Sequence, residues 1–263
     1  MRVGYTGADL FVDALEQYGV THLFGNPGTT ELPIMNALSE SDLEYVLGLH
    51  EDIAVGMASG YASTRRYFSQ SRSGDVMNPV GVVNLHVTPG LAHGLGNLYN
   101  ADAAGVPLVV TAGDHSTDFA HEEPLLSGDL EKVADEFTKW SAEVSDVSAL
   151  PTMVRRAFRT ALTPPTGPVF LGLPMDVMTE ETDAEPERLG PVPDAGRGDR
   201  SQVERAAEKI AEATQPVLVV GDGVARSSGG VEGVVELAES SGARVHAEIL
   251  ASEVDFPTDH DQW

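Results

Sequence analysis

The sequence predicts an α/β protein built around a doubly wound parallel sheet, and two observations lead to this prediction. Short runs of apolar residues alternate along the chain with longer segments of helical periodicity. The apolar runs resemble strands that are covered on both faces. Together they indicate a parallel sheet with helices on both sides.

The first helix is expected directly after a capping box of Thr6 and Asp9, and it ends at Gly19. Residues 65–79 are polar and contain Ser, Gly and Asp, which is typical of an exposed loop. The strand at residues 45–47 is expected to be buried. The other expected strands of this domain are 21–24, 80–85, 106–113 and 169–173. Further helices are expected to begin at about Glu31 and Glu51 and to cover residues 91–103, 129–137 and 149–162.

The pattern divides the chain into a first domain at residues 1–179, a linker at 180–199 and the start of a second domain at 200–263. The linker is rich in Pro, Glu, Asp and Gly. After it come a helix at 201–213, a strand at 216–221, a helix at 231–240 and a strand at 243–247. Two strands cannot cover their own faces and edges, so this α/β unit is expected to be incomplete.

The chain of 263 residues is strongly acidic, with a net charge of −25, and its carboxylates are spread along the sequence. Phosphates would be repelled, which argues against nucleic acid and anionic membranes as partners. Such a surface is typical of proteins that work in high salt, where self-repulsion is screened. There is no cysteine, which excludes disulfides, and no leader-like or membrane-spanning apolar run. A cytoplasmic protein is therefore expected.

Glu51 opens a helix of small and apolar residues directly after the strand at 45–47. It either caps the first turn or serves as an acid–base group, and acidic first turns are common. Gly56 and Gly60 each cost about 1 kcal/mol of helix stability relative to Ala. That cost indicates that a flat or bulky group comes close to the helix.

Several chemically useful residues follow directly after expected strands, namely the loop at 25–29, Glu51, His86 and Gly113. The carboxyl ends of parallel strands meet at one edge, where such sheets bind ligands. These residues are therefore expected to come together. The loop lacks the lysine and the spacing of a P-loop, and it is not a GxGxxG fingerprint. On its own it could equally be an ordinary strand–helix turn.

Four segments occur in a recognisable order: FGNPGTTELP at 24–33, LHE at 49–51, NLH at 84–86 and GPVFLGLP at 167–174. In this order and spacing they resemble the N-terminal part of the thiamine-diphosphate-dependent decarboxylases and carboligases, such as benzoylformate decarboxylase and the acetolactate synthase large subunit. The resemblance covers nearly the whole chain. It implies a pyrimidine-binding domain, thiamine diphosphate as cofactor and a 2-oxo acid as substrate. It also implies a homodimer, or a partner chain that carries the diphosphate-binding domain.

The resemblance implies catalytic roles for three residues. Glu51 matches the glutamate that hydrogen-bonds a ring nitrogen of the cofactor's aminopyrimidine and so promotes removal of the thiazolium proton. His86 matches a proton-transferring histidine of benzoylformate decarboxylase, whereas acetolactate synthases carry a small residue there. Thr29 matches a hydroxyl residue that faces the substrate.

The cofactor-binding positions implied by the resemblance are Pro27, Gly28, Glu51 and His93. At His93 this sequence departs from the family, which usually has an asparagine there. His50 beside Glu51 is as in acetolactate synthases, so the residues favour neither subgroup uniformly.

Each of these assignments has a structural alternative. His86 could be a strand-end histidine bonded to the backbone, and Thr29 could be a helix cap, a role that is compatible with facing a substrate. His115 and His121 belong to no motif and are expected to be ordinary polar residues.

The sequence assigns no metal site. Gly221-Asp222-Gly223 looks like the start of the family's metal–diphosphate motif, but no asparagine follows it anywhere in the chain. The oxygen ligands that would hold Mg²⁺ on a diphosphate are thus not encoded, and Mg²⁺ is expected only with a further domain. The alternative function is a non-catalytic fragment or interaction subunit. A nucleotide-binding protein is disfavoured because no glycine fingerprint follows a strand.

Overall fold

The computed structural model describes residues 4–71, 78–193 and 195–263. The chain divides into two compact units, residues 1–194 and 195–263, and the division falls inside the segment 180–199. The first part of that segment is packed on the first unit. The carbonyl of Glu180 accepts the N–H of Gly7, and the hydroxyl of Tyr18 donates to the carbonyl of Glu187.

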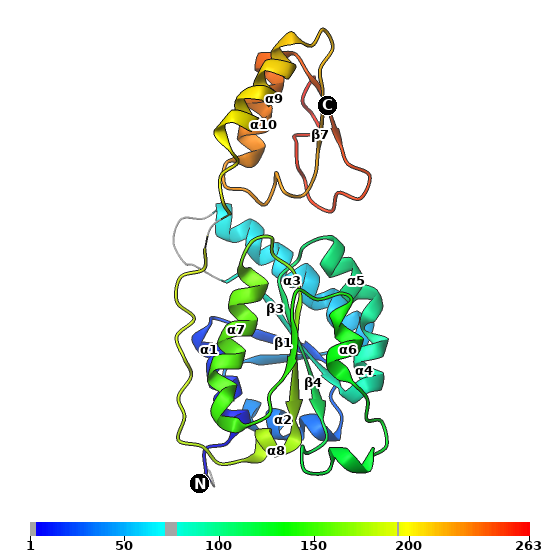
Figure 1. Ribbon diagram of the computed structural model, residues 1–263, viewed down its shortest axis with the longest axis vertical. Coiled ribbons are helices and arrows are strands. Elements are labelled where there is room, and N and C mark those ends of the chain that lie inside the picture. The colour runs from blue at the N-terminus through cyan, green and yellow to red at the C-terminus, as the bar shows by residue number, and fades with distance from the viewer. Residues whose placement is uncertain (1–3, 72–77, 194) are drawn as a thin grey trace. The chain divides into compact units, whose positions relative to one another are not determined.

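The first unit is a six-stranded sheet in which all pairings are parallel, in the order β2-β1-β3-β4-β6-β5 (Figure 1). This confirms the predicted parallel α/β fold. The strands are β1 (His22–Gly25), β2 (Glu44–Leu47), β3 (Gly81–His86), β4 (Leu108–Asp114), β5 (Ser141–Glu143) and β6 (Val169–Pro174).

Helices cover both faces of this sheet, as the doubly wound pattern predicts (Figure 1). One face carries α1 (Gly7–Gln17), α2 (Leu32–Leu38), α7 (Leu150–Leu162) and α8 (Met175–Thr179). The other carries α3 (Glu51–Ser71), α4 (Val87–His93), α5 (Leu95–Ala103) and α6 (Leu130–Asp135).

Alternate residues of the central strands enter two separate apolar cores. Val82 and Val109 face the core under α1 and α7, whereas Val83 and Val110 face the core under α3 and α5. All four side chains are fully buried. Burying a side chain of this size is worth roughly 1.5–3 kcal/mol. The apolar runs that predict the strands therefore also stabilise the packing of helices on both faces of the sheet.

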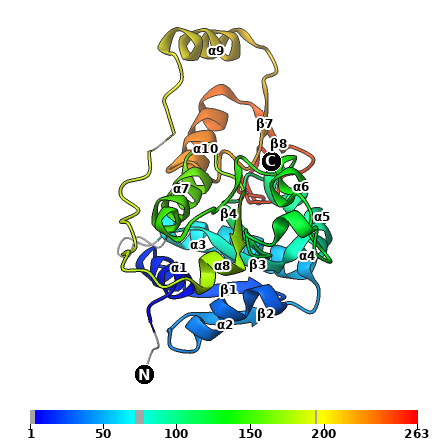
Figure 2. The ribbon, with the colours of Figure 1, turned by 60° about the horizontal axis from the view of Figure 1, so that its bottom comes forward.

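The strand predicted at residues 45–47 is present as β2 (Glu44–Leu47), but the prediction that it is buried is wrong. It lies at the edge of the sheet beside β1 (Figure 2). Its side chains are half-buried or exposed. Its apolar residues Tyr45 and Val46 look like those of a central strand, because a sequence run does not reveal whether a strand has one neighbour or two. β5, at the opposite edge, is short and polar and gave no strand signal.

The expected loop at 65–79 is wrong for residues 65–71, which continue α3. Arg65 and Arg66 are buried because their guanidinium groups find acceptors. Arg65 donates to the carbonyl of Gly19 over 2.9 Å, and Arg66 donates to Thr166 Oγ1 over 3.0 Å. Residues 72–77 of the expected loop lie outside the described part of the chain.

The helix expected at 91–103 begins earlier and is divided. α4 starts at Val87, directly after β3, and Gly94 separates it from α5. Val87 has a φ of 40°, a left-handed conformation that is costly for a β-branched residue. Such strain is of the order of 1–3 kcal/mol and is held in place by the surrounding packing, since Val87 is fully buried.

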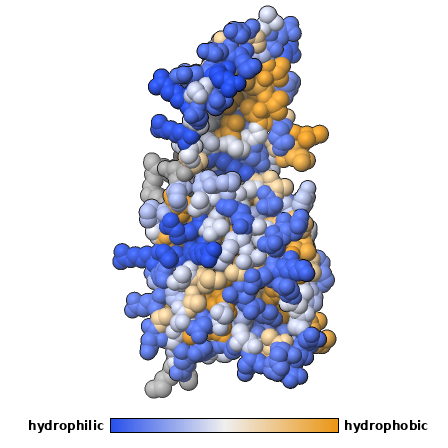
Figure 3. Space-filling view, in the orientation of Figure 1, coloured by the Kyte–Doolittle hydropathy of each residue, from blue (hydrophilic) through white to orange (hydrophobic). Residues whose placement is uncertain are grey.

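The second unit contains α9 (Arg200–Glu212), β7 (Val217–Val220), α10 (Gly230–Ser241) and β8 (Arg244–Ala247). Its two strands are parallel, and its small core includes Val220, Val245 and Phe256. Val217 and Val219 remain exposed on β7, and Figure 3 shows hydrophobic surface on this unit. Within the described residues of the whole chain, none of the helices has the length and apolar character needed to cross a bilayer.

Candidate cofactor-binding site

The carboxyl ends of four neighbouring strands form one edge of the sheet in the first unit. Gly25, at the end of β1, lies beside Leu47 of β2 and Asn84 of β3. His86, at the end of β3, lies beside Gly113 of β4. The segments that follow these strands therefore meet, as the alternation of strands and helices predicts.

A buried carboxylate, Glu31, ties these segments together. Its Oε1 accepts the N–H of Gly113 (2.9 Å) and the hydroxyl of Thr30 (2.7 Å), and its Oε2 accepts the N–H of Gly28 (2.7 Å). The same Oε2 lies 2.8 Å from Nδ1 of His86. The Glu31 side chain has no exposed surface. A carboxylate this deep is tolerated because hydrogen-bond donors surround it.

Glu31 is the residue that the sequence analysis missed. It was noted only as the start of a helix, whereas it ends a 3₁₀ turn, η1 (Thr29–Glu31), and its side chain returns to the N–H of Gly28. The available signal was a glutamate three residues after a glycine, directly after a strand. That spacing is typical of a capping box, and here the capping carboxylate also reaches a second and a third strand.

The contact with Glu31 determines how His86 is presented. Its Nδ1 lies close to both Glu31 Oε2 and Thr30 Oγ1 (3.1 Å), so Nε2 is the ring nitrogen left for other chemistry. The alternative of a histidine bonded to backbone is therefore wrong. Gly28 is required here, because a Cβ added to it would lie 2.3 Å from His86 Nδ1.

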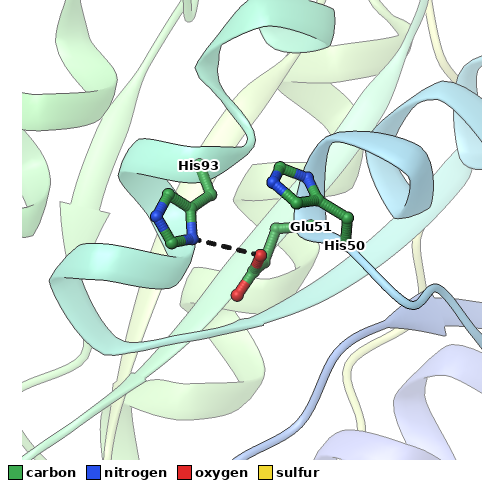
Figure 4. Close-up of side chains that lie close together, drawn as sticks. All are labelled: His50, Glu51 and His93. Carbon is green, nitrogen blue, oxygen red and sulfur yellow. Dashed lines mark hydrogen bonds and ion pairs between the residues drawn. The ribbon is translucent and has the colours of Figure 1, made fainter.

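Glu51 begins α3 at the same edge and keeps 13% of its side chain exposed. Its Oε2 lies 3.3 Å from Nδ1 of His93, at the end of α4 (Figure 4). A Cβ added to Gly90 would lie 3.4 Å from both Glu51 Oε1 and His86 Cβ, so these two side chains flank the same glycine. Among the described residues, His93 is the only hydrogen-bond partner of the Glu51 side chain.

The start of α3 is fixed by a clasp between Asp52 and Asn97. The N–H of Asn97 donates to Asp52 Oδ1 (2.7 Å), and its side-chain amide donates to the carbonyl of Asp52 (2.8 Å). A Cβ on Gly56 would lie 3.0 Å from that amide, so the group close to Gly56 is a protein side chain. Gly60 has no protein atom within 4 Å of an added Cβ, so the approach of a bulky group there stays a prediction.

Thr29 belongs to the same turn as Glu31, but its side chain takes no part in the hydrogen bonds of Glu31. It is exposed and borders an open groove of about 880 Å³ together with Leu32, Pro33, Met175 and Met178. It does not cap α2, whose N-cap is Glu31. Pro27 is half-buried in the loop that leads to it.

A second group of carboxylates lies at the ends of β4 and β5. Burial raises the pKa of Glu143 to about 7, and the charge of Asp114 and a hydrogen bond with it act in the same direction. Asp176 adds to this effect and accepts the N–H of Thr117 (3.0 Å) through Oδ2.

Asp222 in the second unit serves its own loop. Its carboxylate accepts the N–H groups of Ser252 (2.8 Å) and Glu253 (3.0 Å) and pairs with Arg226 (3.0 Å). Burial would raise the pKa of Asp222, but these hydrogen bonds and the charge of Arg226 outweigh it and lower the pKa. His115 and His121 contact Leu125 and Glu122, as ordinary polar residues do.

The fold and this edge define a class: an α/β domain with a histidine paired to a buried glutamate (His86–Glu31) and a partly exposed carboxylate (Glu51) at the carboxyl ends of parallel strands. Comparison with known proteins narrows the class. The family profile described as thiamine pyrophosphate enzyme, N-terminal TPP binding domain, matches residues 5–138. The chain therefore belongs to the thiamine pyrophosphate enzymes.

Individual relatives agree with this assignment. Benzoylformate decarboxylase of Pseudomonas aeruginosa is 34% identical over 254 residues, which cover 94% of this chain and 45% of that protein. Acetolactate synthase of Bacillus subtilis is 32% identical over 215 residues, which cover 82% of this chain and 36% of that protein. The structure of a thiamine diphosphate-dependent 4-hydroxybenzoylformate decarboxylase of Rhodococcus jostii superposes with a TM-score of 0.82 at 34% identity, covering 97% and 46%.

The chain corresponds to the N-terminal part of decarboxylase and acetolactate-synthase-like members of the family. It spans less than half the length of the curated relatives it matches.

Proposed function

We propose that this chain supplies the pyrimidine-binding half of a thiamine-diphosphate-dependent site that acts on a 2-oxo acid. The observation that supports the proposal is the placement of Glu51. Its carboxylate sits at the ligand-binding edge of the sheet, held by the Asp52–Asn97 clasp, and shares Gly90 with His86. Residues 1–179 would form this domain and 200–263 the opening of a central domain, with 180–199 between them.

The residues at this edge fit the pyrimidine end of the cofactor. Glu51 can accept a further hydrogen bond, because His93 contacts only one of its two carboxylate oxygens and part of the side chain is exposed. Partial burial strengthens a hydrogen bond from a ring nitrogen. Gly28 and Gly90 have no side chains, which leaves room beside His86 and Glu51. Pro27 lies in the loop directly before Gly28. When bound, thiamine diphosphate supplies the nucleophilic carbon and the electron sink for loss of carbon dioxide.

In this proposal Glu51 holds the proton that it exchanges with the aminopyrimidine, and His93 steadies the Glu51 carboxylate. His86 moves a proton to or from the substrate through Nε2, because Glu31 engages Nδ1. Thr29, which is exposed, is proposed to face the substrate, as the family resemblance implies for this position. The presence of His86 favours decarboxylation over ligation of two 2-oxo acids.

The diphosphate and its Mg²⁺ are proposed to be held by a diphosphate-binding domain outside these 263 residues, in further sequence or on a partner chain, with the cofactor between two subunits. Exposed apolar residues beside Glu51, namely Leu49 and Ile53, support an interface there. The net charge of −25 supports work in high salt. The cytoplasm remains the compartment expected from the sequence, and cell fractionation tests it.

Calorimetric titration of the chain with thiamine diphosphate tests the role of Glu51. Weak binding is expected, and Glu51→Gln should abolish it, whereas Glu208→Gln, an exposed change in α9, should leave it unchanged. Turnover of pyruvate or benzoylformate by the chain alone should be negligible. Measurable turnover, or equal binding by the Glu51→Gln variant, would contradict the proposal.

A non-catalytic interaction subunit is the second candidate, and the exposed Val217 and Val219 on β7 favour it. Co-purification distinguishes the two. A companion chain with a diphosphate-binding domain that restores turnover supports the enzyme. A companion without such a domain supports the interaction subunit.

A further inference from the structure

We propose that His50, Glu51 and His93 form a binding site for a divalent transition metal of the zinc type. The fold brings the three side chains together although His93 lies 42 residues from Glu51. One possible ligand atom from each lies within 4.8 Å of the others. Figure 4 shows the two imidazole rings on either side of the carboxylate, and their centroids are 5.5 Å apart.

The spacing suits a small coordination sphere. Zinc binds imidazole nitrogen and carboxylate oxygen at about 2.0–2.2 Å, so two ligands of a tetrahedral ion lie roughly 3.4 Å apart. Glu51 Oε2 and His93 Nδ1 already lie 3.3 Å apart. A cation bound by both atoms would replace the contact between them. The ligand atom of His50 lies within 4.8 Å of the other two, and the exposed side chains of His50 and His93 have room to rotate toward a bound ion.

His50 can offer either ring nitrogen to a metal at the cost of a single hydrogen bond. Nδ1 of His50 accepts the N–H of Asp52 over 3.2 Å, so the neutral ring carries its proton on Nε2. A metal at Nδ1 replaces this hydrogen bond, and a metal at Nε2 requires the other tautomer, which gives it up. In either case the loss is one long, solvent-exposed hydrogen bond.

Charge and exposure favour a cation that keeps water ligands. His93 is 58% exposed and His50 is exposed, so solvent can complete the coordination sphere. The net charge of −25 raises the local concentration of cations around the chain. Imidazole selects zinc, nickel, copper and cobalt, whereas Mg²⁺ prefers oxygen ligands in octahedral geometry. The site is therefore expected to discriminate against Mg²⁺.

The site has one corollary that rests on the proposed function. Zinc and the aminopyrimidine would both use Glu51, so each would weaken binding of the other. The test below contains no thiamine diphosphate. Its failure would remove the metal site and leave the proposed function as it stands, and failure of the proposed function would leave the metal site.

Calorimetry of the full chain with Zn²⁺ alone tests the proposal, in about 1 M NaCl to screen the diffuse attraction of an acidic surface. One Zn²⁺ per chain is expected. His93→Asn, His50→Gln and Glu51→Gln should each weaken binding at least about tenfold. His121→Asn is the matched control, because His121 and Glu122 form an equally close pair (3.3 Å) outside this cluster. It should leave the zinc affinity unchanged.

A second measurement keeps the result independent of mutation. Addition of Co²⁺ or Zn²⁺ to the unaltered chain should perturb the ring proton resonances of His50 and His93 before those of His121. The proposal is overturned if no stoichiometric binding occurs, if His93→Asn binds as tightly as the unaltered chain, or if Mg²⁺ displaces Zn²⁺ at equal concentration. Equal perturbation of all three histidines would also overturn it.

Discussion

Nδ1 of His86 lies 2.8 Å from Oε2 of Glu31, and the Glu31 side chain is completely buried. This pair joins the loop after β1 to the end of β3, and through the N–H of Gly113 it reaches β4. A single carboxylate thus aligns the segments from which the proposed site is built. A change of Glu31 should therefore affect mainly stability, whereas a change of His86 should affect mainly turnover.

Removal of Glu31 should destabilise the first unit. Glu31→Ala leaves the N–H groups of Gly28 and Gly113 without acceptors, and a loss of about 3 kcal/mol in the free energy of unfolding is expected. Glu31→Gln should also destabilise, because its amide nitrogen would face an N–H donor. Urea denaturation measures both. Stability within about 0.5 kcal/mol of the unaltered chain would contradict the role given to Glu31.

His86 should matter more for turnover than for folding. In an enzyme completed by a diphosphate-binding domain, His86→Gln should lower kcat by about 10²-fold or more, the usual contribution of a proton-transfer group. His115→Gln is the control, since the ring of His115 contacts a loop carbonyl and lies outside the Glu31–His86 pair. A small effect on kcat from His86→Gln would show that Nε2 takes no part in the reaction.

Two glycines should respond in opposite directions to alanine. A Cβ at Gly113 would lie 2.1 Å from Glu31 Oε1, so Gly113→Ala should destabilise the first unit clearly. Gly60 lies inside α3 with nothing within 4 Å of an added Cβ, so Gly60→Ala should stabilise by about 0.5–1 kcal/mol. Thermal unfolding of the two variants compares them directly, and equal shifts would refute the difference in packing.

Glu143 should make stability depend on pH near neutrality. Burial raises its pKa to about 7 in the folded chain, above its ordinary value in the unfolded chain. The folded state therefore binds the extra proton, and this contribution is complete below the ordinary carboxyl pKa and is lost as the pH rises through about 7. The difference in Tm between the unaltered chain and Glu143→Gln should change with pH in this window. A constant difference would show that Glu143 titrates normally.

The sequence was sufficient for the sheet, because the apolar runs of β3, β4 and β6 are buried on both faces and leave a clear signal. It was insufficient at the edges. β2 carries apolar residues without being buried, and β5 is nearly polar. The extension of α3 past residue 65 depends on acceptors for Arg65 and Arg66 that come from distant segments.

For the site, sequence reasoning correctly gathered the ends of the strands but overlooked Glu31. A buried glutamate looks like any helix-start glutamate until its partners on β3 and β4 are known. The neighbourhood of His50 and His93 was equally hidden, since only the packing of α4 against α3 creates it. The type of each residue can be read from the sequence, but its contacts depend on how the strands and helices are arranged in the fold.

The clasp between Asp52 and Asn97 has a consequence for how a ligand would be received. Because α5 anchors the first turn of α3, the backbone at Glu51 is expected to move little when a ligand binds. Preorganisation of this kind lowers the conformational entropy lost on binding, since the ligand does not have to order the first turn of α3. Recognition at this edge is therefore expected to proceed close to lock-and-key.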